Sequence, residues 1–168
     1  SFAEDPLPPL PRAPNPELLS NGRMGVGIDG ACPKQQEIKL RRSEWGVFAG
    51  EGHPWNRSRR SRGRHQNSAR SEVRAHTCVA EGAAAHQQAI HIWFLNASVV
   101  DGMQHILNGG SVHGFANLDL WTRIATAVYA LGEEFFAIEW VPSHLEKEDV
   151  NVVVSERAYL FNERADRL

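Results

Sequence analysis

The chain has 168 residues, 42% of them hydrophobic, and a formal net charge of −2. This apolar content is enough to bury one substantial core, so we expect one domain with tails. The near-neutral charge excludes a chain-wide attraction for polyanions, so any nucleic-acid binding must come from a local basic patch.

The cysteines and the hydropathy of the chain limit the kinds of fold and the cell compartments that we expect. Cys32 and Cys78 are the only cysteines, and they form neither a CxxC pair nor a zinc-ligand spacing with histidine, so neither a disulfide scaffold nor a structural zinc is expected. No apolar run approaches the roughly 20 residues that a membrane helix needs, and residues 1–17 lack the apolar stretch of a signal peptide. We expect an intracellular protein, in the cytoplasm or nucleus, with no membrane partner.

The chain begins with a proline-rich segment. Residues 1–17 contain six prolines, which excludes a helix or a central strand and indicates an extended linker or N-terminal strap over residues 1–22. The folded domain is expected over residues 23–168. Because the chain starts without Met and stops at Leu168 inside a helical pattern, we expect it to be a segment of a longer polypeptide.

Strand and helix patterns then follow one another along the chain. Short apolar runs at 24–28 and 44–49 predict two strands that could pair. Ser71 is the expected N-cap of a helix over 71–85, and residues 90–95 are typical of a strand buried on both faces. The later pattern predicts helices at 99–107 and 118–131, a strand at 135–141 and a closing helix at 155–168. Strands interspersed with helices indicate an α/β fold.

Four polar residues stand where chemistry could occur. Asp29 ends the first strand, Glu72 lies in the first turn of a helix, His144 follows the last strand, and Asp166 lies near the chain end. Taken singly, each has an ordinary explanation: a turn aspartate before glycine, a helix-dipole partner, a loop histidine and a solvated helix face. Their joint order along the chain is more informative than any one of them.

Several short motifs follow one another over residues 23–168. The first strand contains Gly27–Cys32 (GIDGAC), and the WGV sequence Trp45–Val47 follows it. A later helix carries Glu72 near its start and Glu81 nine residues on. The motifs Asn117–Trp121 (NLDLW), Trp140–His144 (WVPSH) and Asn162–Asp166 (NERAD) come next. In this order they resemble the ribonuclease H family, whose corresponding motifs are DGSC, WGV, the helix with two glutamates, NxDLW, WVKGH and NERxD.

The resemblance implies an α/β, ribonuclease H-like fold, with a mixed five-stranded sheet and helices on both faces. It also implies two-metal endonucleolytic hydrolysis of the RNA strand of RNA/DNA hybrids. Two Mg²⁺ or Mn²⁺ ions about 3.5–4 Å apart would need hard oxygen ligands. Asp29 would be a shared ligand, Glu72 and Asp166 would be flanking ligands, and His144 would assist proton transfer or product release.

One position departs from the family pattern. The family has a ligand aspartate at the end of its fourth strand, in a segment resembling TDSxYVxxG, where this chain has FLNASVVDG. Counting back from Gly102 puts Leu95 there without a gap, or Asn96 with one deletion. Asn96 could offer a neutral carbonyl oxygen to a metal, Leu95 offers nothing, and Asp101 is expected to lie too far downstream to substitute. We therefore expect a weakened metal site.

A basic strip is expected to contact nucleic acid. Residues 57–74 contain seven arginines and one acid, and guanidinium groups suit phosphate oxygens. A solvated loop is the alternative interpretation. The residues expected to bind nucleic acid are Gly30, Ala31, Cys32, Arg59, Arg60, Arg62, Asn67 and Arg70.

Three functions remain open on the sequence. The first is a metal-dependent hybrid ribonuclease, weakened by the lost carboxylate and part of a retroelement-type polypeptide. The second is a catalytically inactive relative that binds hybrid or other double-stranded nucleic acid, or connects neighbouring structures. The third is another nuclease or an integrase-like protein of the same fold, which would need the carboxylates but not the NxDLW and WVxxH motifs.

Overall fold

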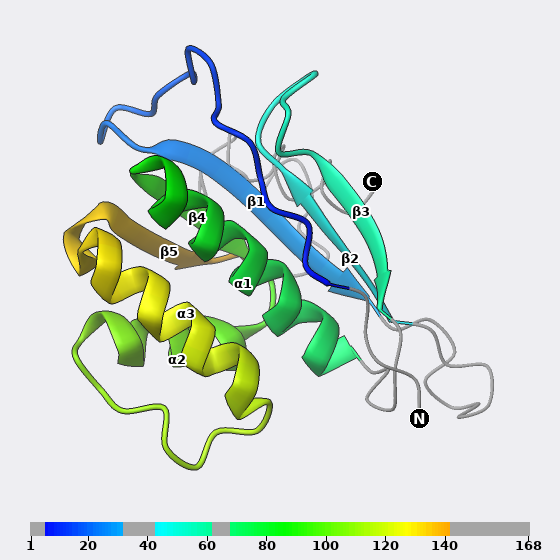
Figure 1. The fold of residues 1–168 in the computed structure, drawn as a ribbon, viewed down its shortest axis with the longest axis vertical. Coiled ribbons are helices and arrows are strands. Elements are labelled where there is room, and N and C mark those ends of the chain that lie inside the picture. Colours follow the sequence, from blue (N-terminus) through cyan, green and yellow to red (C-terminus); the bar gives the residue numbers. More distant parts are fainter. Residues whose placement is uncertain (1–5, 32–42, 62–67, 142–168) are drawn as a thin grey trace.

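The computed structural model describes residues 6–31, 43–61 and 68–141 (Figure 1). Five strands form one sheet in the order β3-β2-β1-β4-β5. The β1–β2 and β2–β3 pairs are antiparallel, whereas the β1–β4 and β4–β5 pairs are parallel. The mixed five-stranded sheet and the α/β class expected from the sequence are confirmed. The strands are β1 (Met24–Ala31), β2 (Ser43–Phe48), β3 (Arg57–Ser61), β4 (Ile90–Phe94) and β5 (Phe136–Trp140).

The described helices share one core with one face of the sheet, and Figure 1 shows α1 and α3 crossing in front of the strands. Ile28, Ile92 and Ile138 of the sheet belong to the same buried cluster as Val79 of α1 and Ile124 of α3. Burying these side chains is the main stabilising term of the fold. No described helix is long and apolar enough to cross a membrane. The helices are α1 (Ser68–His86), α2 (Ala97–Leu107) and α3 (Leu118–Leu131), with a short 3-10 helix η2 (Glu133–Phe135) before β5.

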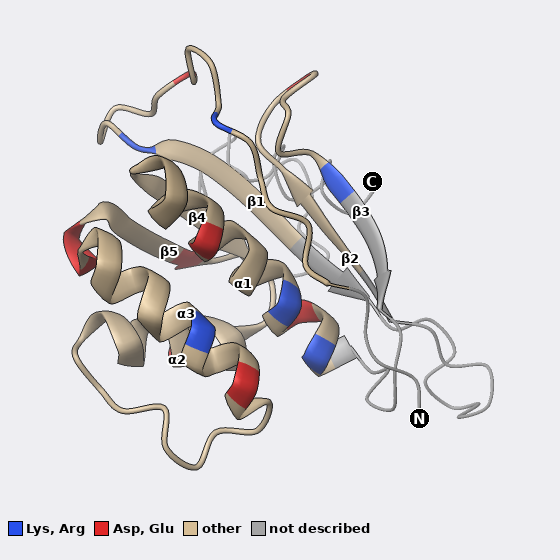
Figure 2. Cartoon of the chain, in the orientation of Figure 1, with Lys and Arg blue, Asp and Glu red and all other residues tan. Residues whose placement is uncertain are grey.

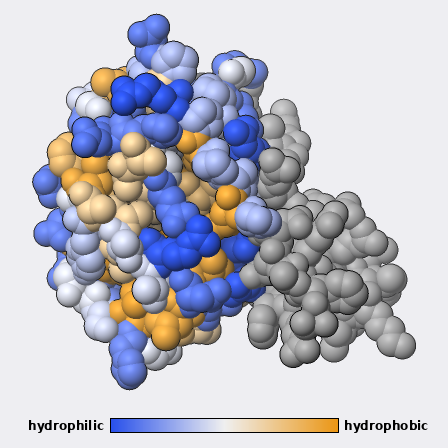
Figure 3. Space-filling view, viewed as in Figure 1, coloured by the Kyte–Doolittle hydropathy of each residue, from blue (hydrophilic) through white to orange (hydrophobic). Residues whose placement is uncertain are grey.

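The other face of the sheet carries a second, smaller cluster. Phe48, Trp93 and Val141 are buried in it, with Leu19 and Leu95 packed against them. Successive side chains of a strand point to opposite faces, which is how β4 contributes to both clusters. The closing helix expected at 155–168 lies outside the described residues. The described helices pack on one face of the sheet only, so helices on both faces stay a prediction. On the surface shown in Figure 3, apolar residues form patches interrupted by hydrophilic ones.

Two elements differ from the sequence expectation. The basic strip is not a single loop, because its first five residues form β3, in which Arg59 lies opposite Trp45. An edge strand tolerates a row of charged side chains, and such a strand has no apolar pattern to reveal it. The helix α1 begins at Ser68, so Ser71 is a buried residue inside the helix rather than its N-cap. Two residues with good helix propensity, Ala69 and Arg70, extend the helix at this end.

The N-terminal segment before β1 packs on α1 and on the β2–β3 connection. Its Leu10 side chain is buried in the main core. Trp55 Nε1 donates a hydrogen bond to the Pro11 carbonyl at 2.6 Å, and Cys78 Sγ of α1 donates to another strap carbonyl, that of Pro8, at 3.2 Å. The described part of this segment thus lies as a strap against the helical side of the domain (Figure 1). The domain boundary expected after it stays a prediction.

Candidate active site

The candidate site lies where β1 and β4 run side by side toward their carboxyl ends. The two strands are parallel, with Ile28 opposite Phe94. Asp29 follows Ile28 in β1, and its backbone pairs with Gly46 of β2. Asn96 follows Phe94 by two residues and is the N-cap of α2. The parallel pairing therefore places the backbone of Asp29 near the carboxyl end of β4, where α2 begins.

Glu72 of α1 and Asn96 are joined by a hydrogen bond. Asn96 Nδ2 donates to Glu72 Oε2 at 2.8 Å. The Asn96 Oδ1 atom accepts from the backbone N–H groups of Ser98 at 2.9 Å and Val99 at 3.2 Å. These two donors are among the first N–H groups of α2, which have no partner within the helix. One side chain thus caps α2 and fastens it to α1.

The orientation of the Asn96 amide follows from these partners. Two N–H groups require an oxygen on one side, so the amide hydrogens must face Glu72. An amide oxygen has two lone pairs, and both are used by the helix N-terminus. In this arrangement Asn96 presents donors, not an oxygen, to the place where a cation would bind. Its role as a metal ligand stays a prediction, without support from this geometry.

Leu95, the alternative occupant of the missing ligand position, points elsewhere. Its side chain packs with Phe48, Trp93 and Val141 on the second face of the sheet. The Leu95 carbonyl accepts a hydrogen bond from Trp140 Nε1 at 2.8 Å. Of the two candidates, only Asn96 lies beside Glu72.

Burial governs the protonation of this region. Burial raises the pKa of the Glu72 carboxyl to about 7, and the hydrogen bond from Asn96 opposes part of this rise. One turn further along α1, burial lowers the pKa of His76 to about 4. The neutral His76 ring donates from Nδ1 to the Glu72 carbonyl at 2.9 Å and packs edge-on against Phe94, with ring centroids 4.4 Å apart. The buried, apolar surroundings of Glu72 disfavour a negative charge that has no partner.

An open pocket of about 480 Å³ adjoins the Glu72–Asn96 pair. We call it the α1–α2 pocket, because most of its lining lies on α1 and α2; the connection before α3 and Trp121 of α3 complete its walls. Asp101, expected from the sequence to lie too far away to matter, lines this pocket together with the pair. The pocket lining is Ala69, Glu72, Val73, Asn96, Ser98, Val99, Asp101, Gly102, His105, Phe115, Ala116, Asn117 and Trp121.

The described side chains do not by themselves fit two divalent ions. In the part of the chain that the structure describes, no three or more Asp, Glu, His or Cys side chains cluster as metal ligands would. Clustered carboxylates are what paired Mg²⁺ or Mn²⁺ ions require. The Asp29 side chain, Asp166 and His144 fall outside what is described, so their convergence with Glu72 stays a prediction.

Comparison with known proteins places this arrangement in a known architecture. No family model and no curated protein matches the sequence. The solution structure of the prototype foamy virus RNase H domain superposes with a TM-score of 0.62 at 14% identity, covering 85% of this chain and 89% of that one. LC9-RNase H1, a type 1 RNase H with the type 2 active-site motif, superposes with a TM-score of 0.54 at 18% identity, over 86% and 70%.

This chain has a ribonuclease H-like fold. A third similar structure, the foamy viral protease-reverse transcriptase in complex with an RNA/DNA hybrid, has a TM-score of 0.56 at 11% identity. The match covers 90% of this chain but 22% of that one, so the chain spans about a fifth of the foamy viral protein.

Within this ribonuclease H-like fold, the residues expected to bind nucleic acid are only partly described. Gly30 and Ala31 lie in β1, and Arg59 and Arg60 lie in the edge strand β3, all four described by backbone alone. Arg70 is buried and donates to Asp119 and Asn117 of the α3 N-terminus, so its guanidinium has partners within the chain. Figure 2 shows basic residues at the start of α1 and an acidic one at the start of α3. Cys32, Arg62 and Asn67 lie outside the described residues.

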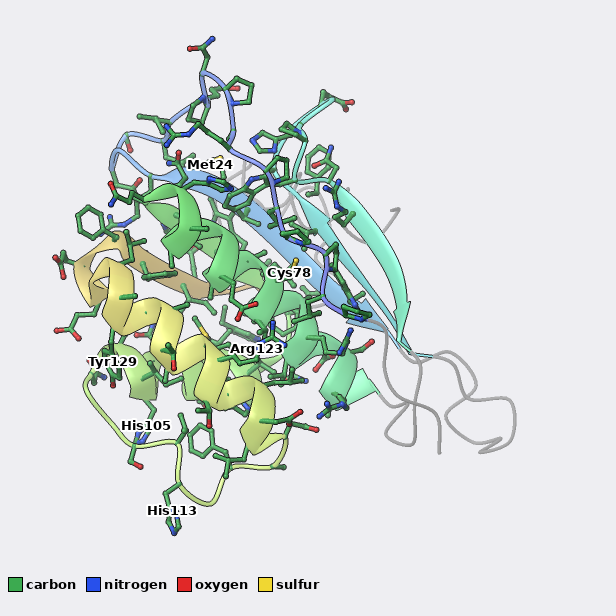
Figure 4. All side chains as sticks on the ribbon, viewed as in Figure 1. Met24, Cys78, His105, His113, Arg123 and Tyr129 are labelled. Carbon is green, nitrogen blue, oxygen red and sulfur yellow. The ribbon has the colours of Figure 1, made fainter. Side chains whose placement is uncertain are left out.

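Sequence reasoning missed two histidines of this ribonuclease H-like domain. His76 is fully buried beneath Glu72, and His105 lines the α1–α2 pocket. Figure 4 shows His105 beside the connection that follows α2, whereas His113 points away from the protein. The spacing of Asp101 and His105, four residues apart on one helix face, was a readable signal that they share an environment. His76 lies three residues from both Val73 and Val79, so its place on the apolar face of the helix was readable from the sequence, although its position beneath Glu72 was not.

Proposed function

We propose that this chain is a ribonuclease H-type domain that binds RNA/DNA hybrids and hydrolyses their RNA strand only slowly. The observation that carries the proposal is the Asn96–Glu72 hydrogen bond. Where the family pattern has a ligand carboxylate, this chain has an amide that donates to Glu72 and whose oxygen is used to cap α2. The site thereby lacks one charged ligand, and both polar groups of the Asn96 side chain have hydrogen-bond partners.

Charge counting gives the physical reason for slow hydrolysis. Asp29, Glu72 and Asp166 would supply three negative charges against the four positive charges of two Mg²⁺ or Mn²⁺ ions, whereas the family pattern supplies four. The second ion would then bind weakly, and one ion cannot serve both the attacking and the leaving oxygen. His144 keeps its proposed part in proton transfer or product release. Remaining activity is expected to be higher with Mn²⁺ than with Mg²⁺, because Mn²⁺ binds the same ligands more tightly.

Hybrid binding is supported by the neighbours and by the basic strip. One similar structure is a foamy viral protease-reverse transcriptase in complex with an RNA/DNA hybrid. In this chain, Arg59 and Arg60 lie on an edge strand, where no further strand pairs with them in the described sheet. We extend the proposal to a domain that works within a longer polypeptide, as the foamy viral neighbours do.

The NxDLW motif favours this function over that of another nuclease of the same fold. Asn117 and Asp119 both accept hydrogen bonds from Arg70, two residues before Glu72 in α1. The motif therefore holds the helix that carries Glu72. A nuclease without this motif would need another way to place that carboxylate.

Cleavage of a labelled RNA/DNA hybrid tests the proposal. The unmodified chain should bind the hybrid and cleave it far below 1 s⁻¹, the lower end of typical enzyme rates. Asn96→Asp keeps an oxygen that can cap α2 and adds the missing charge, so it should raise the rate by orders of magnitude. Leu95→Asp is the matched control, because its carboxylate would lie on the other face of the sheet and should not raise the rate.

Three results would contradict the proposal. A rate of about 1 s⁻¹ or more for the unmodified chain, with no gain from Asn96→Asp, would mean that another group completes the site. Failure to bind the hybrid would remove the nucleic-acid assignment altogether. Binding with no cleavage by either protein would contradict residual hydrolysis and favour the inactive binding module.

A further inference from the structure

The α1–α2 pocket has the size and walls of a small-ligand site. Its volume of about 480 Å³ lies within the usual range for small-molecule pockets, roughly 300–1,000 Å³. Val73 of α1, Val99 of α2, Phe115 and Trp121 give it apolar and aromatic walls. The pocket begins at the Glu72–Asn96 pair, where the proposed function places the nucleic-acid strand.

The aromatic wall of the pocket is held in place by close packing. Phe115 packs edge-on against Trp121, with ring centroids 5.4 Å apart, and lies 5.6 Å from the His105 ring. A side chain at Gly102 would begin 2.6 Å from the Trp121 ring, so glycine permits this approach. His105 Nε2 donates to the Ser111 carbonyl at 2.7 Å, which fixes the connection after α2. A wall built in this way needs little reordering to receive a ring.

The polar groups of the pocket select against anions. Glu72 and Asp101 line it, and no arginine or lysine does so among the described residues. A phosphate would therefore be repelled, whereas a neutral ring that donates hydrogen bonds would be attracted. Ser98 and Asp101 are three residues apart on α2, so they lie on the same face of the helix. A hydroxyl beside a carboxylate matches an amino group next to a ring nitrogen.

We propose that the α1–α2 pocket binds an unpaired base that carries an amino group beside a ring-nitrogen acceptor, as adenine and cytosine do. The ring would pack against the wall of Val99 and Phe115, the exocyclic amino group would donate to Asp101, and the neighbouring ring nitrogen would accept from the Ser98 hydroxyl. Uracil presents a carbonyl oxygen in place of that amino group and would meet the Asp101 carboxylate with an unpaired acceptor. The inference deepens the proposed function, since a nucleic acid bound at Glu72 would present the base.

Titration of the full chain with adenosine tests the pocket without any phosphate. Adenosine should bind about tenfold more tightly than uridine, which is within the discrimination that a good paired hydrogen bond gives. Amide chemical-shift changes should concentrate on α2 and the connection to α3. Asp101→Asn should abolish the preference, because the side-chain amide can meet either base.

A substitution that fills the pocket with a large side chain is the second test. Ala69 is an exposed residue of α1 that lines the pocket, so Ala69→Trp should abolish adenosine binding. Ala130→Trp, at an exposed alanine of α3 outside the pocket, is the matched control and should bind adenosine normally. Equal affinity for the two nucleosides, or none for either, overturns the inference even if the hybrid binds. Loss of hybrid binding with adenosine binding intact instead overturns the proposed function.

Discussion

The Arg70 guanidinium binds both carboxylate oxygens of Asp119, with distances of 3.1 Å to Oδ1 and 2.8 Å to Oδ2. The Arg70 side chain is 8% exposed and the Asp119 side chain 63%, so a buried cation meets its partner at the domain surface. The hydrogen bonds from Arg70 lower the pKa of Asp119. A third bond, at 3.2 Å to Asn117 Oδ1, makes Arg70 the link between the starts of α1 and α3.

Arg70→Lys should separate the geometry of this link from its charge. An ammonium group cannot make the paired contact or reach Asn117 at the same time, so the free energy of unfolding should fall by about 1–2 kcal/mol. Urea unfolding measures this loss. Arg123→Lys, at an exposed pair with Glu81, is the control and should cost less than about 1 kcal/mol. Equal losses for the two variants would mean that the paired contact of Arg70 stabilises the fold no more than the Arg123–Glu81 pair does.

The arginines of β3 and the following segment should supply the salt dependence of hybrid binding. Replacing Arg59, Arg60 and Arg62 together by alanine should weaken binding and flatten the slope of log affinity against log salt, because each phosphate contact releases counterions. Filter binding or fluorescence anisotropy at several salt concentrations measures the slope. Arg123→Ala, whose guanidinium is paired with Glu81, should leave it unchanged. A triple variant with an unaltered slope would leave the strip without this role.

Most elements were predictable because their patterns are local. The helix expected at 118–131 matches α3, whose apolar spacing and following Gly132 define both ends. The strand β4 was expected within one residue, since a run of large apolar residues buried on both faces is typical of a central strand. By contrast, β3 is polar along its whole length, and only pairing with β2 makes it a strand.

The candidate site was predictable in its residue types but not in its geometry. A one-residue shift moves a side chain to the other face of a sheet, so counting along the sequence could not choose between Leu95 and Asn96. The choice follows from partners that are distant in sequence, Glu72 for one and Phe48 for the other. The α1–α2 pocket has the same origin, because its walls come from α1, α2, the connection before α3 and α3 itself, which only the fold brings together.

The buried Glu72 carboxyl should make stability depend on pH. Its pKa of about 7 in the folded chain exceeds the value near 4.3 of an unfolded chain, so the folded state binds more protons between these values. The free energy of unfolding should therefore fall as pH rises from about 4.5 to about 7. Glu72→Gln removes this loss while its oxygen still accepts from Asn96. The variant should be more stable than the unmodified chain at pH 8, by on the order of 1–3 kcal/mol.

Urea unfolding at pH 4.5 and pH 8 measures the free energy of unfolding of Glu72→Gln and of the unmodified chain. Because His76 is present in both proteins, its titration cancels in the difference. The gain from Glu72→Gln should vanish at the lower pH. Glu81→Gln, on the same helix but at a side chain that is 38% exposed, should show no gain at pH 8. A gain of the same size at both pH values would mean that packing, not charge, distinguishes the two proteins.

Asn96→Asp should make the protein less stable without metal and more stable when a divalent cation is bound. Without metal, the introduced carboxylate can still cap α2, and a negative charge suits a helix N-terminus. It no longer donates to Glu72, however, and two carboxyl groups then face each other across the 2.8 Å contact. Like charges at this distance repel, so the melting temperature of the metal-free variant should lie below that of the unmodified chain.

Adding Mn²⁺ should reverse this order, because a cation between the two carboxylates binds the folded state only. At a concentration about 100-fold above the dissociation constant, such binding contributes about 2.7 kcal/mol, enough to raise the melting temperature by several degrees. The unmodified chain should respond much less, since the Asn96 amide hydrogens face Glu72. Leu95→Asp, which buries a charge beside Trp93, should be destabilised without any recovery in Mn²⁺. An equal Mn²⁺ response from the unmodified chain and the Asn96→Asp variant would show that the amide is no obstacle to the cation, and it would contradict the proposal that hydrolysis is slow for lack of this carboxylate.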